Sequence, residues 1–124
     1  MSHISKLELE VRDLQVLEIA CQRLGLELHR GKRTFKWFGK EAECDHCISV
    51  PGAEYEIGVV KCEGLLNLSC DFFDGNIEKA IGADGGLLKQ AYAVEKARSE
   101  ARKKGYTVVE RQTQTGIQLR VQLA

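Results

Sequence analysis

The first 25 residues pass from a two-residue to a three- to four-residue hydrophobic repeat. Between Leu7 and Val11 apolar positions alternate with charged ones, as in a strand with one buried face. Asp13 can then cap the first free amides of a helix. The apolar positions that follow form one helical stripe: Leu14, Leu17, Cys21 and Leu24. We therefore predict a strand over residues 3–12 and a helix that ends before Gly25.

The middle of the chain contains short apolar runs separated by glycine or proline. Residues 54–73 give the clearest hairpin, in which a two-residue loop at Glu63-Gly64 pairs Val59 with Leu68. Three earlier runs also have the length and composition of strands: 26–30, 33–37 and 43–49.

A second helix and two more strands complete the prediction. Glycines from Gly82 to Gly86 follow about one helical turn at residues 76–81, and a long helix is expected over residues 87–104. Strict alternation from Ile117 to Leu123 predicts the final strand.

These elements predict a single α+β domain over residues 1–124. Because hairpin connections dominate, we expect a mainly antiparallel sheet of about seven to eight strands with two helices packed on one face. We also expect the first strand to pair with the last and cover its edge. The pattern predicts these core positions: Ile57, Val59, Leu68, Cys70, Phe72, Leu119 and Val121.

Composition narrows the class of protein. The 124 residues are 44% hydrophobic and 29% charged, an ordinary globular balance that needs no metal or disulfide. The 18 basic and 18 acidic residues cancel, whereas a generic polyanion binder carries a basic excess. Neither a signal peptide nor an apolar run of about 18 residues is found, so we expect a cytoplasmic protein without a membrane partner. The five cysteines are interpreted as thiols.

The segment Cys44-Asp45-His46-Cys47 resembles half of a metal site. Thiolates separated by two residues can chelate zinc or iron. However, the segment lies in a predicted strand, where residues three apart face opposite ways, and no second pair of ligands completes the set. We therefore expect no metal and no cofactor.

The segment from Arg30 to Trp37 mixes basic and aromatic side chains. A sheet that binds RNA stacks bases on such aromatics beside cations, so Trp37 and Arg33 are candidate binding residues. The other interpretation is a core strand with Phe35 and Trp37 inward and a basic hairpin tip in solvent. The balanced charge of the chain favours the second interpretation, so nucleic acid is not the expected partner.

No recognised catalytic motif occurs in the sequence. The glycines from Gly82 to Gly86 lack the lysine and hydroxyl of a phosphate-binding loop, and we interpret them as a turn between helices. No serine or cysteine stands in a nucleophile motif. The sequence therefore gives no positive sign of an enzyme.

Short signatures along the whole chain resemble one family. They are Met1-Ser2-His3, Tyr55-Glu56-Ile57-Gly58, Cys70-Asp71-Phe72-Phe73, Gln90-Ala91-Tyr92-Ala93 and Gly105-Tyr106-Thr107-Val108. In this order and spacing they are similar to the hypothetical chloroplast reading frame 35 family, also called domain of unknown function 1257.

The resemblance brings no established activity with it. It draws attention to His3 and to Tyr55 and Tyr92, amphipathic residues that could meet between sheet and helix. Tyr55 and Tyr92 are therefore also candidate binding residues. Genes of this kind neighbour genes for AAA-type ATPases, which implies an accessory or adaptor protein with a protein partner. Two alternatives remain open. The first is a protein that binds a small ligand or a metal, or an enzyme, with its site between sheet and helices. The second is a protein that binds RNA on its sheet.

Overall fold

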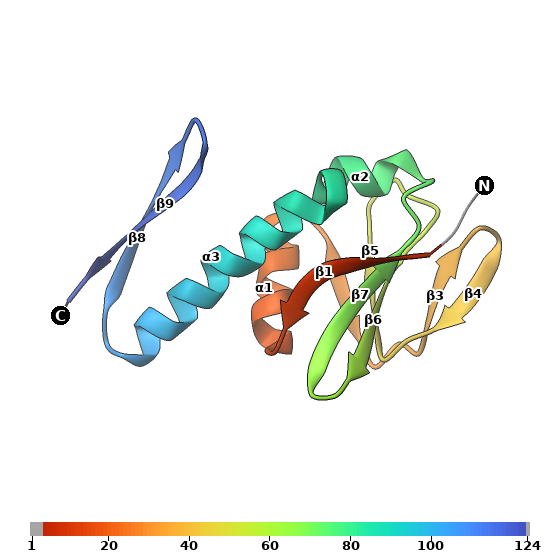
Figure 1. The fold of residues 1–124 in the computed structure, drawn as a ribbon, viewed down its shortest axis with the longest axis horizontal. Coiled ribbons are helices and arrows are strands. Elements are labelled where there is room, and N and C mark those ends of the chain that lie inside the picture. The colour runs from red at the N-terminus through yellow and green to blue at the C-terminus, as the bar shows by residue number, and fades with distance from the viewer. Residues whose placement is uncertain (1–3, 124) are drawn as a thin grey trace.

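A computed structural model describes residues 4–123, which form nine strands and three α-helices (Figure 1). The strands are β1 (Ser5–Val11), β2 (Glu27–Arg30), β3 (Thr34–Trp37), β4 (Lys40–Glu43), β5 (His46–Ser49), β6 (Ile57–Cys62), β7 (Leu65–Cys70), β8 (Thr107–Thr113) and β9 (Gly116–Gln122). The helices are α1 (Leu14–Arg23), α2 (Gly75–Ile81) and α3 (Gly86–Lys103), with a short 3₁₀ turn at Ala83–Gly85 between the last two.

The strands form one central sheet and two separate hairpins. The central sheet has five strands in the order β1-β7-β6-β5-β2, and every neighbouring pair is antiparallel. The prediction of a mainly antiparallel α+β fold is confirmed. The predicted single sheet of seven to eight strands is wrong, because β3 pairs only with β4 and β8 only with β9. The 18 residues of α3 span about 27 Å and carry β8 and β9 away from the central sheet.

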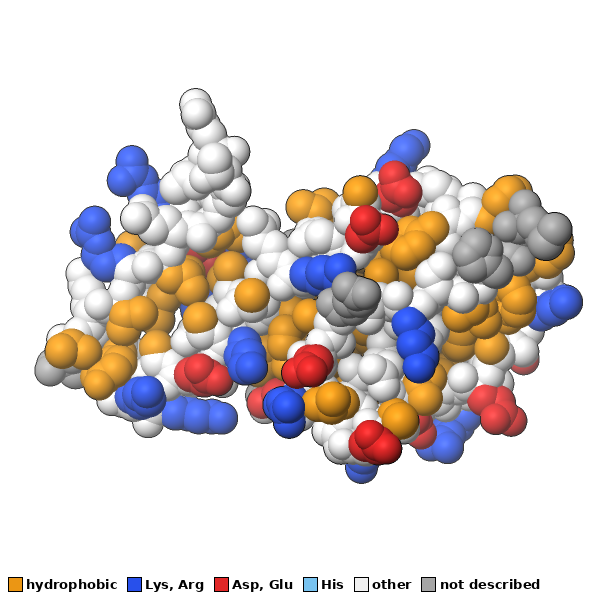
Figure 2. Space-filling model, viewed as in Figure 1, with side chains coloured by type: hydrophobic (Ala, Val, Ile, Leu, Met, Phe, Trp, Pro, Cys, Tyr) orange, Lys and Arg blue, Asp and Glu red, His pale blue; other side chains and the backbone are white. Residues whose placement is uncertain are grey.

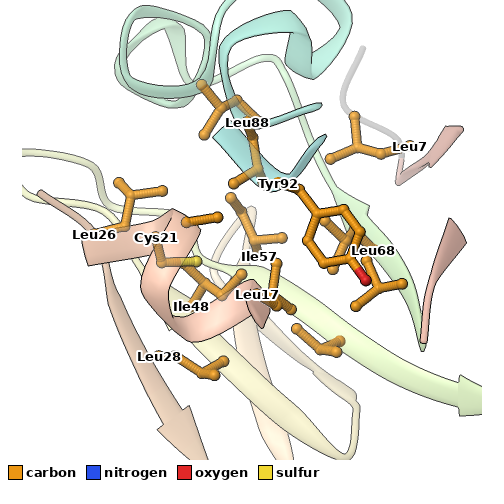
Figure 3. Close-up of a cluster of buried hydrophobic side chains, with 14 of the residues drawn as sticks. Leu7, Leu17, Cys21, Leu26, Leu28, Ile48, Ile57, Leu68, Leu88 and Tyr92 are labelled. Carbon is orange, nitrogen blue, oxygen red and sulfur yellow. The ribbon is translucent and has the colours of Figure 1, made fainter. Parts of the chain in front are cut away.

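The main hydrophobic core lies between the central sheet and the helices. Asp13 caps α1 by accepting hydrogen bonds from the amides of Gln15 and Val16. Leu17 and Cys21 then point into the core beside Ile57 and Leu68 of the sheet (Figure 3). All three helices contribute buried side chains to this one cluster, so the predicted packing on one face is confirmed for the central sheet.

The β6–β7 hairpin fixes the register of the core. Glu63 and Gly64 both have positive φ, as a two-residue type I′ turn requires, and Val59 lies opposite Leu68 as predicted. Four of the predicted core residues are fully buried: Ile57, Val59, Leu68 and Cys70. Phe72 is only half-buried at the edge of the same cluster.

A second, smaller core lies on the opposite face of the central sheet. Phe35 of β3 is buried there with Cys44 and Cys47. A Cβ atom on Gly58 of β6 would overlap the Phe35 ring, so the absent side chain is what lets the ring approach the sheet this closely. The β3–β4 hairpin therefore covers the face that the helices leave free (Figure 1).

The predicted strand over residues 43–49 is broken. β4 ends at Glu43, and β5 begins at His46 in a different sheet. At the break, the amide of Asp45 donates to the carbonyl of Val59 (2.8 Å), and its carboxylate accepts from the amide of Lys61 (2.6 Å). These bonds let the chain cross from the hairpin into the central sheet without orphaned backbone groups.

The β8–β9 hairpin projects beyond the far side of α3 (Figure 1). Glu110 of β8 anchors it through Arg23 of α1 (2.8 Å) and Arg98 of α3 (3.5 Å). The predicted burial of the last strand is wrong, since Leu119 is only half-buried and Val121 is 49% exposed. The predicted cover by the first strand is also wrong, because β1 pairs with β7.

Adding one methyl group to Gly58 tests the contact between the hairpin and the sheet. We expect Gly58→Ala to lower the free energy of unfolding by about 1–3 kcal/mol, the usual cost of overpacking a core. Urea titration measures it. Gly75→Ala is the matched control, because no atom lies within 4 Å of the added carbon. Equal stability of the two variants would show that the Phe35 ring moves aside without cost.

Candidate partner-binding groove

The turn between β3 and β4 places an aromatic side chain in solvent. Phe38 and Gly39 form its two-residue loop, with φ values of 46° and 69°. This type I′ geometry favours asparagine, aspartate or glycine, and a bulky residue with positive φ is an outlier. The Phe38 side chain gains little burial in return, since the residue is 54% exposed. The turn alone gives no reason for phenylalanine at this position.

The loop before β6 forms the facing wall of the site and is held by Asp74. One carboxylate oxygen accepts from the amides of Glu54 (2.8 Å) and Tyr55 (3.1 Å), and the other from the amide of Asn76 (3.0 Å). Partial burial acts to raise the pKa of Asp74, and the three amide hydrogen bonds outweigh it and lower the pKa. One ionised side chain thus caps α2 and positions Tyr55.

Glu56 joins this loop to β3. Its carboxylate accepts hydrogen bonds from the amide of Lys36 (2.9 Å) and the ammonium of Lys32 (2.9 Å), and its own amide donates to the Lys36 carbonyl. Desolvation acts to raise the pKa of Glu56, and the bonds from Lys32 and Lys36 lower it further than burial raises it. The loop and the hairpin are therefore held at a fixed separation.

Between these two walls lies an open groove of about 570 Å³, here called the aromatic groove. Its lining residues are Lys36, Trp37, Gly39, Lys40, Glu41, Glu54 and Tyr55. A smaller hollow of about 320 Å³ continues past Glu54 and Tyr55 to Phe73, which is 66% exposed. Hydrophobic side chains gather at this end of the molecule, over β3 and β4 (Figure 2).

The charges around the aromatic groove balance. Lys36, Lys40 and Glu41 line it from the β3–β4 hairpin, and Glu54 lines it from the facing loop. The Lys40 ammonium lies 5.7 Å from the centre of the Trp37 ring, a cation–π distance. The groove can therefore bury an apolar side chain against Trp37 and Tyr55 while its rim pairs with groups of either sign.

The structure brings together two of the four candidate binding residues. Trp37 and Tyr55 line the aromatic groove from opposite walls. Arg33 lies at the other end of β3, largely exposed and 3.3 Å from Asp45. Tyr92 lies in the main core beside Leu68, and its hydroxyl accepts from the Arg12 amide (3.2 Å) (Figure 3). Tyr55 and Tyr92 thus share the core, but only Tyr55 reaches the groove. His3 lies outside the described residues.

Cys44 and Cys47 do not face opposite ways. The break between β4 and β5 turns both thiols into the second core, so the geometric argument made from a continuous strand is wrong. The Cys44 thiol donates to the Lys32 carbonyl (3.3 Å). Burial, with the Glu56 carboxylate nearby, raises the pKa of Cys47 to about 12. Among the side chains that the structure describes, no group of three histidine, cysteine, aspartate or glutamate residues could hold a metal ion.

The turn between α2 and α3 explains the glycine-rich segment. A Cβ atom on Gly82 would lie 2.8 Å from the Leu87 amide, and one on Gly85 would lie 3.1 Å from Leu7. Both glycines also have positive φ. This agrees with the interpretation of the segment as a turn.

Reasoning from the sequence missed Phe38 and Phe73. Phe38 carried a usable signal, because Trp37-Phe38-Gly39 places an aromatic directly before a turn glycine. Phe73 carried none. Its outward direction depends on a local turn in which its amide donates to the buried carboxylate of Asp71 (2.8 Å).

The chain matches no family model, no curated protein and no solved structure. The resemblance to the chloroplast reading frame 35 family stays a prediction. Among the helices described, none combines the length and the apolar character that crossing a membrane requires.

Thiol reactivity tests the burial of the second core. We expect one of the five cysteines, Cys62, to react rapidly with a disulfide reagent in the native protein, because the other four are buried. The remaining thiols should react only after unfolding in guanidinium. Absorbance of the released thiolate counts them, and Cys62→Ser should remove the fast phase. A second fast thiol would show that Cys44 or Cys47 is open to solvent.

Acid titration tests the Glu56 contacts. Because folding lowers the pKa of Glu56, its contribution to stability is complete above its ordinary value of 4.5 and is lost as the pH falls through the folded value. Glu56→Gln should therefore reduce the unfolding free energy at pH 7 by about 1.5–3 kcal/mol, the contribution of hydrogen bonds to a charged group.

The difference between wild type and Glu56→Gln should shrink as the pH is lowered towards 3. Urea titrations across this range measure it. Glu43→Gln serves as the control, because Glu43 is exposed. A difference that does not depend on pH would contradict the assigned role of the carboxylate.

Proposed function

We propose that the protein is a small accessory protein that binds a segment of a partner protein in the aromatic groove. The observation that carries the proposal is Phe38, an exposed aromatic held in a conformation that favours other residues. It adjoins Trp37 and Gly39, which line a groove completed by Tyr55. Phe38 stands beside the groove rather than in its lining, and Trp37 and Tyr55 line it while partly or largely buried. Aromatic residues are enriched at protein interfaces.

The charges at the groove favour a protein partner over RNA. A phosphate backbone that followed Lys36 and Lys40 would also meet Glu41 and Glu54. The Trp37 ring face that a base would need lies below the Lys40 ammonium. Arg33, the cation expected beside the stacking face, lies away from the groove and beside Asp45.

The groove also suits a protein segment better than catalysis. Glu56, the most enclosed carboxylate near it, already binds Lys32 and the Lys36 amide. Burial raises the pKa of Cys44 and Cys47, so neither thiol is activated as a nucleophile. The carboxylates on the walls, Glu41 and Glu54, are exposed to solvent. The walls thus supply contact surface and charge pairing rather than an enclosed catalytic group.

The partner class that we propose is an AAA-type ATPase. This assignment rests on the resemblance to the chloroplast reading frame 35 family. We also propose a cytoplasmic location, as expected from the sequence. A segment with one large apolar side chain flanked by charges of both signs would match the Trp37–Tyr55 gap and its rim.

A capture experiment with Phe38→Asn tests the proposal. Asparagine tolerates positive φ, so this variant keeps the turn and removes only the aromatic ring. The tagged protein is incubated with native lysate, with and without nuclease, and bound proteins are quantified by mass spectrometry. We expect an AAA-type ATPase in the wild-type sample and about thirtyfold weaker binding by Phe38→Asn, as for loss of an interface hot spot.

Leu87→Gln is the matched control, because Leu87 is a 46% exposed apolar residue on α3, outside the groove. It should bind as the wild type does. Two results would overturn the proposal: a captured protein that Phe38→Asn retains, or a captured set that disappears with nuclease, which would indicate nucleic acid instead.

A further inference from the structure

The outer edge of β9 has no neighbouring strand among residues 4–123. β9 pairs with β8 over the whole length of both strands, from Thr107 opposite Gln122 to Thr113 opposite Gly116. α3 contacts both strands of the projecting hairpin, with the Gln90 side chain beside Gly116 at the start of β9. β8 is the only strand that pairs with β9 among these residues. A two-stranded ribbon is marginally stable in water, and an open edge is a template for another strand.

The two edges of the hairpin differ in how well their charges protect them against pairing with another strand. β8 carries Glu110 and Arg111 at its centre, and charges of this kind discourage strand addition. β9 carries a single charge, Arg120. At its end Val121 is 49% exposed and Leu123 is 74% exposed. Hydrophobic side chains gather near the chain end of this hairpin (Figure 2).

We propose that β9 pairs antiparallel with β9 of a second copy of the chain, around a two-fold axis at Leu119. The two hairpins then form one four-stranded sheet. This inference is independent of the aromatic groove, which lies at the opposite end of the molecule (Figure 1).

The β9 sequence is complementary to itself in this register. Leu119 meets Leu119 of the second copy, and Ile117 meets Val121 on the same face. On the other face, Gln118 meets Arg120, so no like charges are opposed. The two-fold axis repeats each of these pairs, as an isologous interface requires. Val121 stays 49% exposed although Val108 lies opposite it in its own hairpin. Ile117 of the second copy would cover the side of Val121 that Val108 leaves open, and this favours a second copy as the occupant.

Charge changes at Gln118 test the pairing. Gln118 is exposed, and its substitution leaves the apolar face unchanged. Gln118→Glu places a carboxylate opposite Arg120 of the second copy at two symmetric positions, and Gln118→Lys places an ammonium there. From the usual size of cross-strand charge pairs, we expect the dissociation constant of the dimer to fall about tenfold with glutamate and to rise about tenfold with lysine.

Sedimentation velocity over a range of concentrations measures the dimer constant, and circular dichroism checks that each variant folds. Gln114→Glu and Gln114→Lys are matched controls in the exposed β8–β9 turn, outside the paired strands. A wild type that stays monomeric at all concentrations up to about a millimolar, well above the range of specific association, would overturn the proposal. So would a dimer that responds to neither Gln118 variant.

Crosslinking tests the register. In a Cys62→Ser background, Leu119→Cys puts two thiols opposite each other at the axis, where cross-strand Cα atoms come close enough for a disulfide. We expect a covalent dimer on mild oxidation. Val108→Cys, on the same face of β8, should give none. A covalent dimer with Val108→Cys and none with Leu119→Cys would place the interface on the β8 edge and overturn the proposal.

Discussion

The contact between the Phe35 ring and the bare backbone of Gly58 decides how this fold is layered. The helices cover one face of the five-stranded sheet. The other face is left to the β3–β4 hairpin, whose two strands have four residues each. A hairpin of that size cannot fold alone, so it needs an apolar surface to rest on. Gly58 has no side chain and so leaves room for the Phe35 ring, and Cys44 and Cys47 pack around this ring. Without this contact, the aromatic groove would lose one wall.

Two ionised carboxylates then determine the shape of the groove. Glu56 holds the β3 backbone through the Lys36 amide, and Asp74 holds the facing loop through the amides of Glu54 and Tyr55. Hydrogen bonds to ionised acceptors are stronger than those between neutral groups. Each carboxylate bonds to backbone rather than to a mobile side chain alone, so the walls stay in place when no partner is bound.

The two ends of the molecule have different physical characters. The aromatic groove combines rigid rings with balanced charge, which suits selection of a foreign segment. The β8–β9 hairpin offers unpaired backbone and a repeating apolar face, which suits pairing with an identical strand. α3 joins the two, and its own hydrophobic pattern serves both: Leu88, Ala91 and Tyr92 face the main core, while Val94 and Ala101 are buried outside it.

The sequence alone determined much of the local structure, although it did not show the break between β4 and β5. Alternation identified β1 and β9, the helical stripe and Asp13 identified α1, and Glu63-Gly64 set the register of Val59 against Leu68. These features depend on neighbours within a few residues, which the sequence shows directly. It also marked Trp37 and Tyr55 as candidates, and both line the groove.

Only the tertiary structure decided which strands share a sheet and which apolar faces are covered. Val121 stands in the same alternating pattern as Leu68. Leu68 is fully buried in the core to which all three helices contribute, whereas Val121 is 49% exposed. A period-two pattern states that a face is apolar and does not state what lies opposite it. The positions of Tyr92, Cys44 and Cys47 also depend on tertiary packing. Tyr92 lies in the main core, away from the groove, and the break between β4 and β5 brings Cys44 and Cys47 together in the second core.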